Sequence, residues 1–375
     1  MLGGPIGVPF LKRQRILPPP RLIGVDSAAG TKSCVYFRFG AQHLYQARFA
    51  TLRIFDLDLN LVGAIGDATH LNSAGDVEIT ANESFAFVTA EQGATGSCVS
   101  SYDISNKAAP VFVQQFKGPT PGTSLAGATC IRRDGNLLFV ATITRNSVAI
   151  ISINPSTGTM TWVSEFRGSV PGTSLRSCRR ISLDPVHQVC FWVCDNNSGG
   201  TMRMGAFSYA NPASPVQLWA GAPTEADGAR GVYYIPERGM LFVNAGGPSP
   251  FYGMLTAYEI PAPTTTAFPR KLGSFVANGR SSAANRETMQ GTRSTAFKQV
   301  GSRIYAAAVA ETGFNLTLID VTDPTHMFKV AQRWDTTLLN APLDCQFGPD
   351  GKLFTGNFTS GAAQNITKWD LDLAA

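Results

Sequence analysis

The chain has 375 residues, of which 44% are hydrophobic and only 15% are charged, and its formal net charge is +5. Its lysines and arginines are scattered rather than clustered, which argues against a nucleic-acid-binding surface. No apolar run reaches the roughly 18 residues that a transmembrane helix requires, so we expect no membrane span.

Residues 1–20 are predicted to form an extended arm outside the globular part of the chain. Residues 1–11 are mildly apolar and the basic residues 12–15 follow them, the reverse of the order in a secretory signal peptide, so we predict no signal peptide. The prolines at 18–20 favour an extended backbone. A disordered tail and an arm that docks on a partner subunit both fit this composition. The apolar side chains that would anchor a docked arm are Ile6, Val8, Phe10, Leu11, Ile16 and Leu17.

Beyond the arm, a short apolar–polar–apolar triplet recurs at intervals of roughly fifty residues, a period typical of propellers and solenoids. The triplets are Phe55–Leu57, Tyr102–Ile104, Ile151–Ile153, Phe207–Tyr209, Tyr258–Ile260, Ile319–Val321 and Trp369–Leu371. Each alternates with a period of two, as a half-buried β-strand does. Ten residues at 116–125 also return, with small changes, at 166–175. The sequence therefore predicts an array of seven similar units.

The third unit shows the strand pattern most clearly. Four strands are predicted at 127–132, 137–143, 148–153 and 160–166. The first two are joined at residues 134–135, an Asp-Gly hairpin turn in which glycine tolerates a positive φ. No run has helical periodicity. Seven units of four antiparallel strands predict an all-β fold, a seven-bladed β-propeller.

The two ends of the chain predict how the ring closes. Only residues 372–375 follow the seventh triplet, so the last blade lacks a fourth strand. The apolar segment 21–25 precedes the first unit and has no place in it. We predict that this segment completes the last blade, which leaves no blade with an open hydrogen-bonding edge. Residues 21–375 then form one seven-bladed propeller, and residues 1–20 form the arm.

The first strand of each blade lines the central channel of a propeller, and aligning these strands gives a candidate site. The candidate residues at the channel mouth are Arg180, Arg230, Arg293, Asp76 and Asp344. A structural arginine–aspartate network and a site for a small anion both remain open, because the planar guanidinium suits carboxylate or phosphate. A metal site that adds Glu78 to the two aspartates is disfavoured, so no metal and no cofactor are predicted. A slip of one residue in this alignment exchanges a channel residue for a core residue.

The sequence contains no motif of a catalytic centre. It has no Ser-His-Asp set with a nucleophile elbow, no HExxH and no phosphate-binding loop. Its four histidines are isolated, and its seven cysteines are spread over the blades, as expected for core thiols rather than for a disulfide framework. An enzymatic function is therefore the less favoured prediction.

Several segments resemble known propeller families. Residues 316–324, Leu-Thr-Leu-Ile-Asp-Val-Thr-Asp-Pro, resemble the LVIVD repeat of bacterial and archaeal surface propellers, and residues 101–105 are a second match. Residues 134–140, Asp-Gly-Asn-Leu-Leu-Phe-Val, resemble the strand–turn–strand core of YVTN and lactonase-like propellers. The resemblance covers most of the chain as a repeat and implies blades. Lactonase-like relatives imply hydrolysis of sugar lactones at the channel mouth, but no catalytic set of that family maps onto this chain residue by residue.

Three functions follow as hypotheses. The first is a non-catalytic structural or adhesive module, docked through its arm on the protein subunits of a larger assembly. Low charge, a polar surface and the arm together favour a bacteriophage virion, as a tail, fibre or head-decoration protein, or another extracellular assembly; the cytoplasm is the alternative location. The second is a lactonase-like hydrolase. The third is a module that binds a small anion or a surface glycan. The aromatic residues that would stack on a glycan are Trp219, Phe251 and Tyr252.

Overall fold

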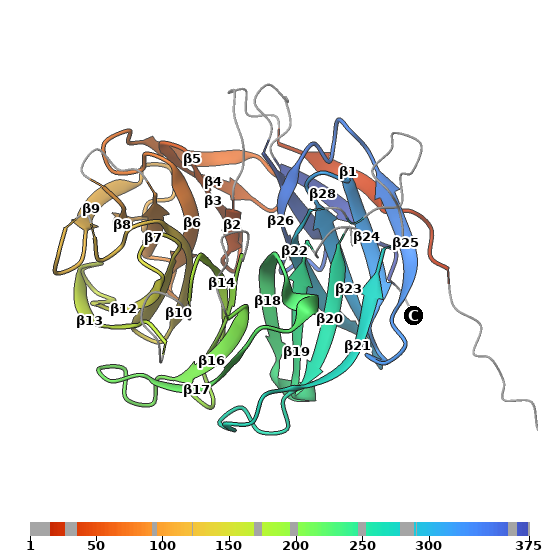
Figure 1. Cartoon of the computed structure of the whole chain (residues 1–375). Coiled ribbons are helices and arrows are strands. Elements are labelled where there is room, and N and C mark those ends of the chain that lie inside the picture. The colour runs from red at the N-terminus through yellow and green to blue at the C-terminus, as the bar shows by residue number, and fades with distance from the viewer. Residues whose placement is uncertain are drawn as a thin grey trace, which may run out of the picture.

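The protein is a seven-bladed β-propeller, as predicted. The computed structural model contains seven four-stranded antiparallel sheets arranged in a ring (Figure 1). It describes residues 16–26, 36–91, 96–121, 123–168, 175–195, 202–246, 253–277, 289, 291–358 and 366–373. Within these ranges the only helices are two short 3-10 turns, η1 (Thr224–Ala226) and η2 (Pro236–Arg238). Neither is long or apolar enough to cross a membrane.

Each blade runs from its innermost strand to its outermost strand in chain order, except the last. Blades one and two are β2 (Tyr36–Phe39), β3 (His43–Arg48), β4 (Thr51–Asp56) and β5 (Leu61–Gly66), then β6 (Ala74–Ile79), β7 (Phe85–Ala90), β8 (Cys98–Asp103) and β9 (Val111–Phe116). Blades three and four are β10 (Ala128–Asp134), β11 (Leu137–Thr142), β12 (Ser147–Ile153) and β13 (Met160–Phe166), then β14 (Cys178–Asp184), β15 (Val189–Cys194), β16 (Met204–Ser208) and β17 (Val216–Gly221).

Blades five and six are β18 (Ala229–Ile235), β19 (Met240–Ala245), β20 (Met254–Glu259) and β21 (Arg270–Val276), then β22 (Thr292–Val300), β23 (Arg303–Ala310), β24 (Asn315–Asp320) and β25 (Phe328–Trp334). Blade seven is β26 (Pro342–Phe347), β27 (Leu353–Asn357), β28 (Ile366–Asp370) and β1 (Arg21–Val25). Every predicted triplet lies at the end of the third strand of its blade. The predicted turn at 134–135 joins β10 to β11, and Gly135 has the left-handed φ of 53° that the turn requires.

The ten-residue repeat is the connection between neighbouring blades. Its first copy follows β9 and its second follows β13, and each ends in a leucine, Leu125 or Leu175, that is completely buried. Leu125 packs between blades two and three, and Leu175 packs between blades three and four. The repeat thus supplies an apolar residue that fills the space between one sheet and the next.

The predicted ring closure is confirmed. Strand β1 pairs antiparallel with β28, with Arg21 opposite Asp370 and Val25 opposite Thr367. In Figure 1 the red strand β1 lies beside the blue strands of blade seven, so the first and last described strands share one sheet.

The described end of the arm lies against the propeller itself. The amide of Leu17 donates a hydrogen bond to the carbonyl of Val330 on β25 at 2.9 Å, and its side chain is buried in the core that blades six and seven share. Ile16 points outward and is 84% exposed. Leu17 is therefore held by its own chain, whereas Ile16 remains available to a partner. The other predicted anchors, Ile6, Val8, Phe10 and Leu11, lie outside the described residues.

Removal of residues 1–25 is expected to open the ring. The truncated protein loses β1 and the buried Leu17, and burial of one leucine alone is worth roughly 2–5 kcal/mol. It should unfold at a lower urea concentration than the full chain, or self-associate through the uncovered edge of β28. The control is a chain that starts at residue 16, which keeps both features. Equal unfolding midpoints and equal elution volumes for the two truncations would contradict the role of β1.

Candidate functional site: the central channel

The innermost strands share an irregularity that decides which side chains face the channel. Six of them, β6, β10, β14, β18, β22 and β26, show a register shift near their first residue when paired with the next strand. Such a β-bulge inserts an extra residue and re-aims the neighbouring side chains. In β14 the bulge lies between Cys178 and Arg180, and both Arg179 and Arg180 then line the channel. Two consecutive residues can therefore face the channel at this point.

The channel is divided into two cavities by a polar partition. The amino-end cavity, where the innermost strands begin, has a volume of about 340 Å³, and the carboxyl-end cavity has a volume of about 510 Å³. Arg180 lines both. Its guanidinium carbon lies 3.7 Å from the centre of the Tyr36 ring, and its Nη1 lies 3.3 Å from Oδ2 of Asp76. Because these contacts reach from blade four to blades one and two, the Arg180 side chain spans the channel.

Asp76 and Asp344, both buried at this partition, have opposite electrostatic environments. Burial by itself would raise the pKa of Asp76, but the positive charges of Arg132 and two further arginines outweigh it and hold the pKa below its ordinary value of 3.8. Oδ2 of Asp76 accepts a hydrogen bond from Arg132 at 2.7 Å. Burial raises the pKa of Asp344 above 3.8, because Arg180 compensates only in part. Asp76 is thus ionised, and it lines neither cavity.

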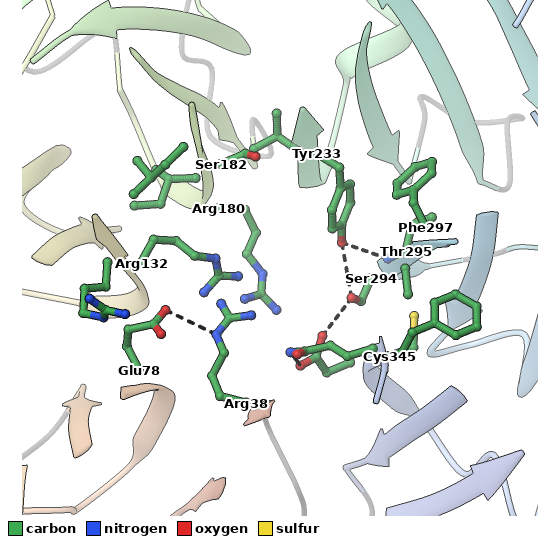
Figure 2. Close-up of a pocket in the computed structure, with 18 of the residues that line it drawn as sticks. Arg38, Glu78, Arg132, Arg180, Ser182, Tyr233, Ser294, Thr295, Phe297 and Cys345 are labelled. Atoms are coloured by element: carbon green, nitrogen blue, oxygen red, sulfur yellow. Dashed lines mark hydrogen bonds and ion pairs between the residues drawn. The ribbon is translucent and has the colours of Figure 1, made fainter. Parts of the chain in front are cut away.

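The carboxyl-end cavity has one charged wall and one neutral wall. Figure 2 shows Arg38, Glu78, Arg132 and Arg180 on one side and Tyr233 with Ser294 on the other. Nε of Arg38 lies 3.4 Å from a carboxylate oxygen of Glu78. On the neutral wall, the Tyr233 hydroxyl accepts a hydrogen bond from the Thr295 amide at 2.8 Å and lies 3.2 Å from Oγ of Ser294. Burial raises the pKa of Tyr233 to about 12, so this phenol stays protonated.

The amino-end cavity contains a chain of alternating charges across blades four to six. Asp195 lies 3.4 Å from Arg179 and 3.5 Å from Arg230. Glu311 lies 3.6 Å from Arg230 and also accepts hydrogen bonds from Arg293. Burial and the neighbouring guanidiniums of Arg293 and Arg179 lower the pKa of Arg230. Three arginines thus share two carboxylates.

The structure divides the predicted site residues between two places. Arg180, Asp76 and Asp344 meet at the partition, whereas Arg230 and Arg293 lie in the amino-end cavity and pair with Glu311. The alignment of first strands missed Arg38 and Arg132. Each lies two residues after the residue of its own strand that is level with the partition, and side chains two residues apart in a strand point to the same face. It also missed Asp195 and Glu311, which follow second strands and share no sequence pattern with the first strands.

The histidines occupy structural positions. Three lie in Asp-x-x-His turns, in which the ring Nδ1 contacts a carboxylate oxygen three residues earlier: His70 on Asp67 at 2.7 Å, His187 on Asp184 at 2.8 Å, and His326 on Asp323 at 3.2 Å. Among the described residues, no three histidine, cysteine, aspartate or glutamate side chains gather as metal ligands would.

Trp219 is not the exposed stacking platform that a glycan site would need. It lies in β17, is 3% exposed and packs edge-on against Phe268 with ring centres 5.5 Å apart. The other two aromatics proposed for glycan stacking, Phe251 and Tyr252, lie outside the described residues.

No protein-family profile and no curated protein sequence matches this chain. Among solved structures, hydrazine synthase of Kuenenia stuttgartiensis is similar with a TM-score of 0.69 and 14% identity, over 92% of this chain and 97% of that one. A chain of the mitotic checkpoint complex has a TM-score of 0.65 and 12% identity, over 98% and 96%. Sqt1 of Saccharomyces cerevisiae has a TM-score of 0.60 and 11% identity, over 90% and 83%. At these identities the similarity shows the fold alone.

Asparagine substitutions should separate the roles of the two buried aspartates. Asp76→Asn removes the charge that balances Arg132 and Arg180, and should lower the free energy of unfolding by roughly 3–5 kcal/mol at neutral pH. The lowered folded-state pKa of Asp76 means that its contribution is present above its ordinary pKa of 3.8 and is lost as the pH falls. The deficit of this variant should therefore shrink in acid.

Asp344→Asn is the matched substitution, and its effect on the free energy of unfolding should have the opposite sign. The raised folded-state pKa of Asp344 means that its ionisation opposes folding as the pH rises above 3.8. The asparagine variant should therefore gain stability relative to the unmodified protein between about pH 4 and pH 7. Urea unfolding at both pH values measures both variants. If the free energies of unfolding of the two variants changed with pH in the same direction relative to the unmodified protein, the opposite electrostatic environments of Asp76 and Asp344 would be contradicted.

Proposed function

We propose that this protein is a non-catalytic β-propeller that acts as a structural or adhesive interaction module in a larger assembly. The observation that carries the proposal is that most of the ionisable side chains described in the channel and turns are committed to one another. Asp76 is held by arginines, Asp195 and Glu311 are shared among three more, and three histidines are fixed by carboxylates in their own turns. These are the arrangements of a scaffold, whereas a general acid or base must be free to exchange a proton.

The outer surface of the propeller supports a role in contacts with other proteins. The outermost strands of blades one, two and four each begin with an exposed apolar residue: Leu61 at 49%, Val111 at 60% and Val216 at 62%. Ile16 adds a further exposed apolar side chain where the arm meets the propeller. Loops and edges on a rigid scaffold are where interaction surfaces are usually built.

We further propose a setting for the assembly. The low fraction of charged residues fits a protein that is covered by its neighbours in a particle, such as a tail, fibre or head-decoration protein of a bacteriophage virion. The LVIVD-like residues 316–324 favour a surface propeller in the same way. The similar chain from the mitotic checkpoint complex belongs to a multiprotein complex, which is a precedent for this fold in such a role.

The arm provides the test. A chain that starts at residue 16 keeps Leu17 and β1, so it should unfold at the same urea concentration as the full chain. It should nevertheless be incorporated into the assembly at least tenfold less, as measured by quantitative mass spectrometry of purified particles. Normal incorporation of this folded, truncated chain would exclude the arm as the attachment element.

One observation favours a second candidate function, a lactonase-like hydrolase. Asp76 and Asp344 lie at the same partition with pKa values displaced in opposite directions, a pattern found in acid–base pairs, and Asp344 lines the carboxyl-end cavity. This candidate requires that the purified protein hydrolyse small sugar lactones and that Asp344→Asn, which should remain folded, reduce the rate at least a hundredfold. Absence of turnover, or equal turnover by the variant, would exclude it.

A further inference from the structure

The charged wall of the carboxyl-end cavity holds more hydrogen-bond donors than the protein uses. Nε and one Nη of Arg38 are buried and have no hydrogen-bond partner among the described residues. Its ion pair with Glu78, at 3.4 Å, is not aligned as a hydrogen bond. A buried, unsatisfied guanidinium nitrogen costs free energy, so its presence in a native structure calls for a water or a ligand that completes it.

The neighbouring arginines add to this excess. Among the described residues, Arg38, Arg132 and Arg180 form ion pairs with two carboxylates, Asp76 and Glu78, and Asp344 adds a more distant electrostatic interaction with Arg38 and Arg180. Asp76 does not line the cavity, so it balances charge without occupying the space in which a ligand would lie. The three guanidiniums come from blades one, three and four and lie together on one side of the cavity (Figure 2).

The remaining walls determine what kind of molecule fits. Arg133 also lines the cavity but is occupied, since it donates to the carbonyls of Ile79 and Gly135. The opposite wall is apolar at Val232 and Phe297. A volume of about 510 Å³ falls within the range of small-molecule sites, which combine apolar walls with a few polar or charged groups that orient the ligand.

We propose that the carboxyl-end cavity binds a small organic anion, with its phosphate or carboxylate group on Arg38, Arg132 and Arg180 and its uncharged body against the neutral wall. The planar guanidinium forms paired hydrogen bonds with phosphate and with carboxylate, so either head group fits these arginines. Glu78 competes with the ligand for Arg38, because it is the carboxylate nearest to the unsatisfied nitrogens. Asp344 lies at the partition, where its Oδ1 accepts a hydrogen bond from Ser294 Oγ at 2.8 Å. The site does not depend on the proposed role in an assembly.

The test is calorimetric titration of the full chain with four probes: phenyl phosphate, phenylacetate, inorganic phosphate and acetate. We expect saturable binding of at least one aromatic probe, and tighter binding of that probe than of the ion that matches its head group. The better of the two aromatic probes identifies the head group as phosphate or carboxylate. Absence of saturable binding by both aromatic probes, or equal binding of each with its simple ion, would overturn the proposal.

Paired substitutions locate the site. Arg38→Gln should weaken binding at least tenfold, whereas Glu78→Gln should strengthen it severalfold by releasing Arg38. The controls for charge are Arg270→Gln and Glu259→Gln, which break an exposed ion pair on blade five and should change binding less than twofold. Because Glu78→Gln predicts a gain, it remains informative even if Arg38→Gln fails to fold.

A third substitution distinguishes the two cavities. Arg293→Gln alters only the amino-end cavity, and binding should be unchanged. If Arg293→Gln weakens binding and Arg38→Gln or Glu78→Gln has no effect, the anion occupies the amino-end cavity and the proposal is overturned. An Arg38→Gln protein that is folded and binds as well as Arg270→Gln would overturn it equally.

Discussion

The hydrogen bonds between β1 and β28 are the constraint on which the remaining structure depends. Each blade buries its two faces against its two neighbours, so the ring has no free end at which a sheet could be left uncovered. Blade seven packs against blade one through Phe354 and Phe37, and against blade six through Trp369 and Leu318. Blade seven obtains its fourth strand from β1 alone, and Leu22 of β1 packs against the same core as Trp369.

A closed ring creates the electrostatic situation in the channel. Innermost strands that converge from all sides bring charged side chains together at the partition, where Asp76 and Arg180 are buried and an unpaired charge would be costly. The bulges increase the number of side chains that face this space, and Arg180 and Asp76 illustrate the result: each is almost completely buried, and each is tolerated because the other is present. The buried charges at the partition must therefore be paired for the protein to fold. The need for charge balance does not explain why Arg38 retains hydrogen-bond donors without a partner.

The blades follow from the sequence more directly than the channel does. The blades were predictable because the strands are short, turn residues separate them and the third strand of each blade ends in an alternating triplet. The predicted strand 160–166 coincides with β13, and the predicted segment 21–25 coincides with β1. Both follow from local backbone chemistry and from a repeat. The channel was only partly predictable. A β-bulge shifts by one residue the alternation between side chains that face the channel and side chains that do not, and no residue type in the sequence marks where a bulge occurs. Arg230 and Arg180 were both predicted at the channel mouth, yet Arg230 lines only the amino-end cavity, whereas Arg180 lies at the partition and lines both cavities.

The position of the closing strand affects how the molecule is assembled from a nascent chain. Arg21 and Asp370, which pair in the finished protein, are 349 residues apart in sequence. Hairpins within blades form over short separations, whereas this junction must wait for nearly the whole polypeptide. Until then β1 has no sheet to join, and blade seven lacks its fourth strand. Two molecules at that stage are complementary to each other, so high concentrations during refolding favour dimers in which each copy has donated its first strand to its neighbour.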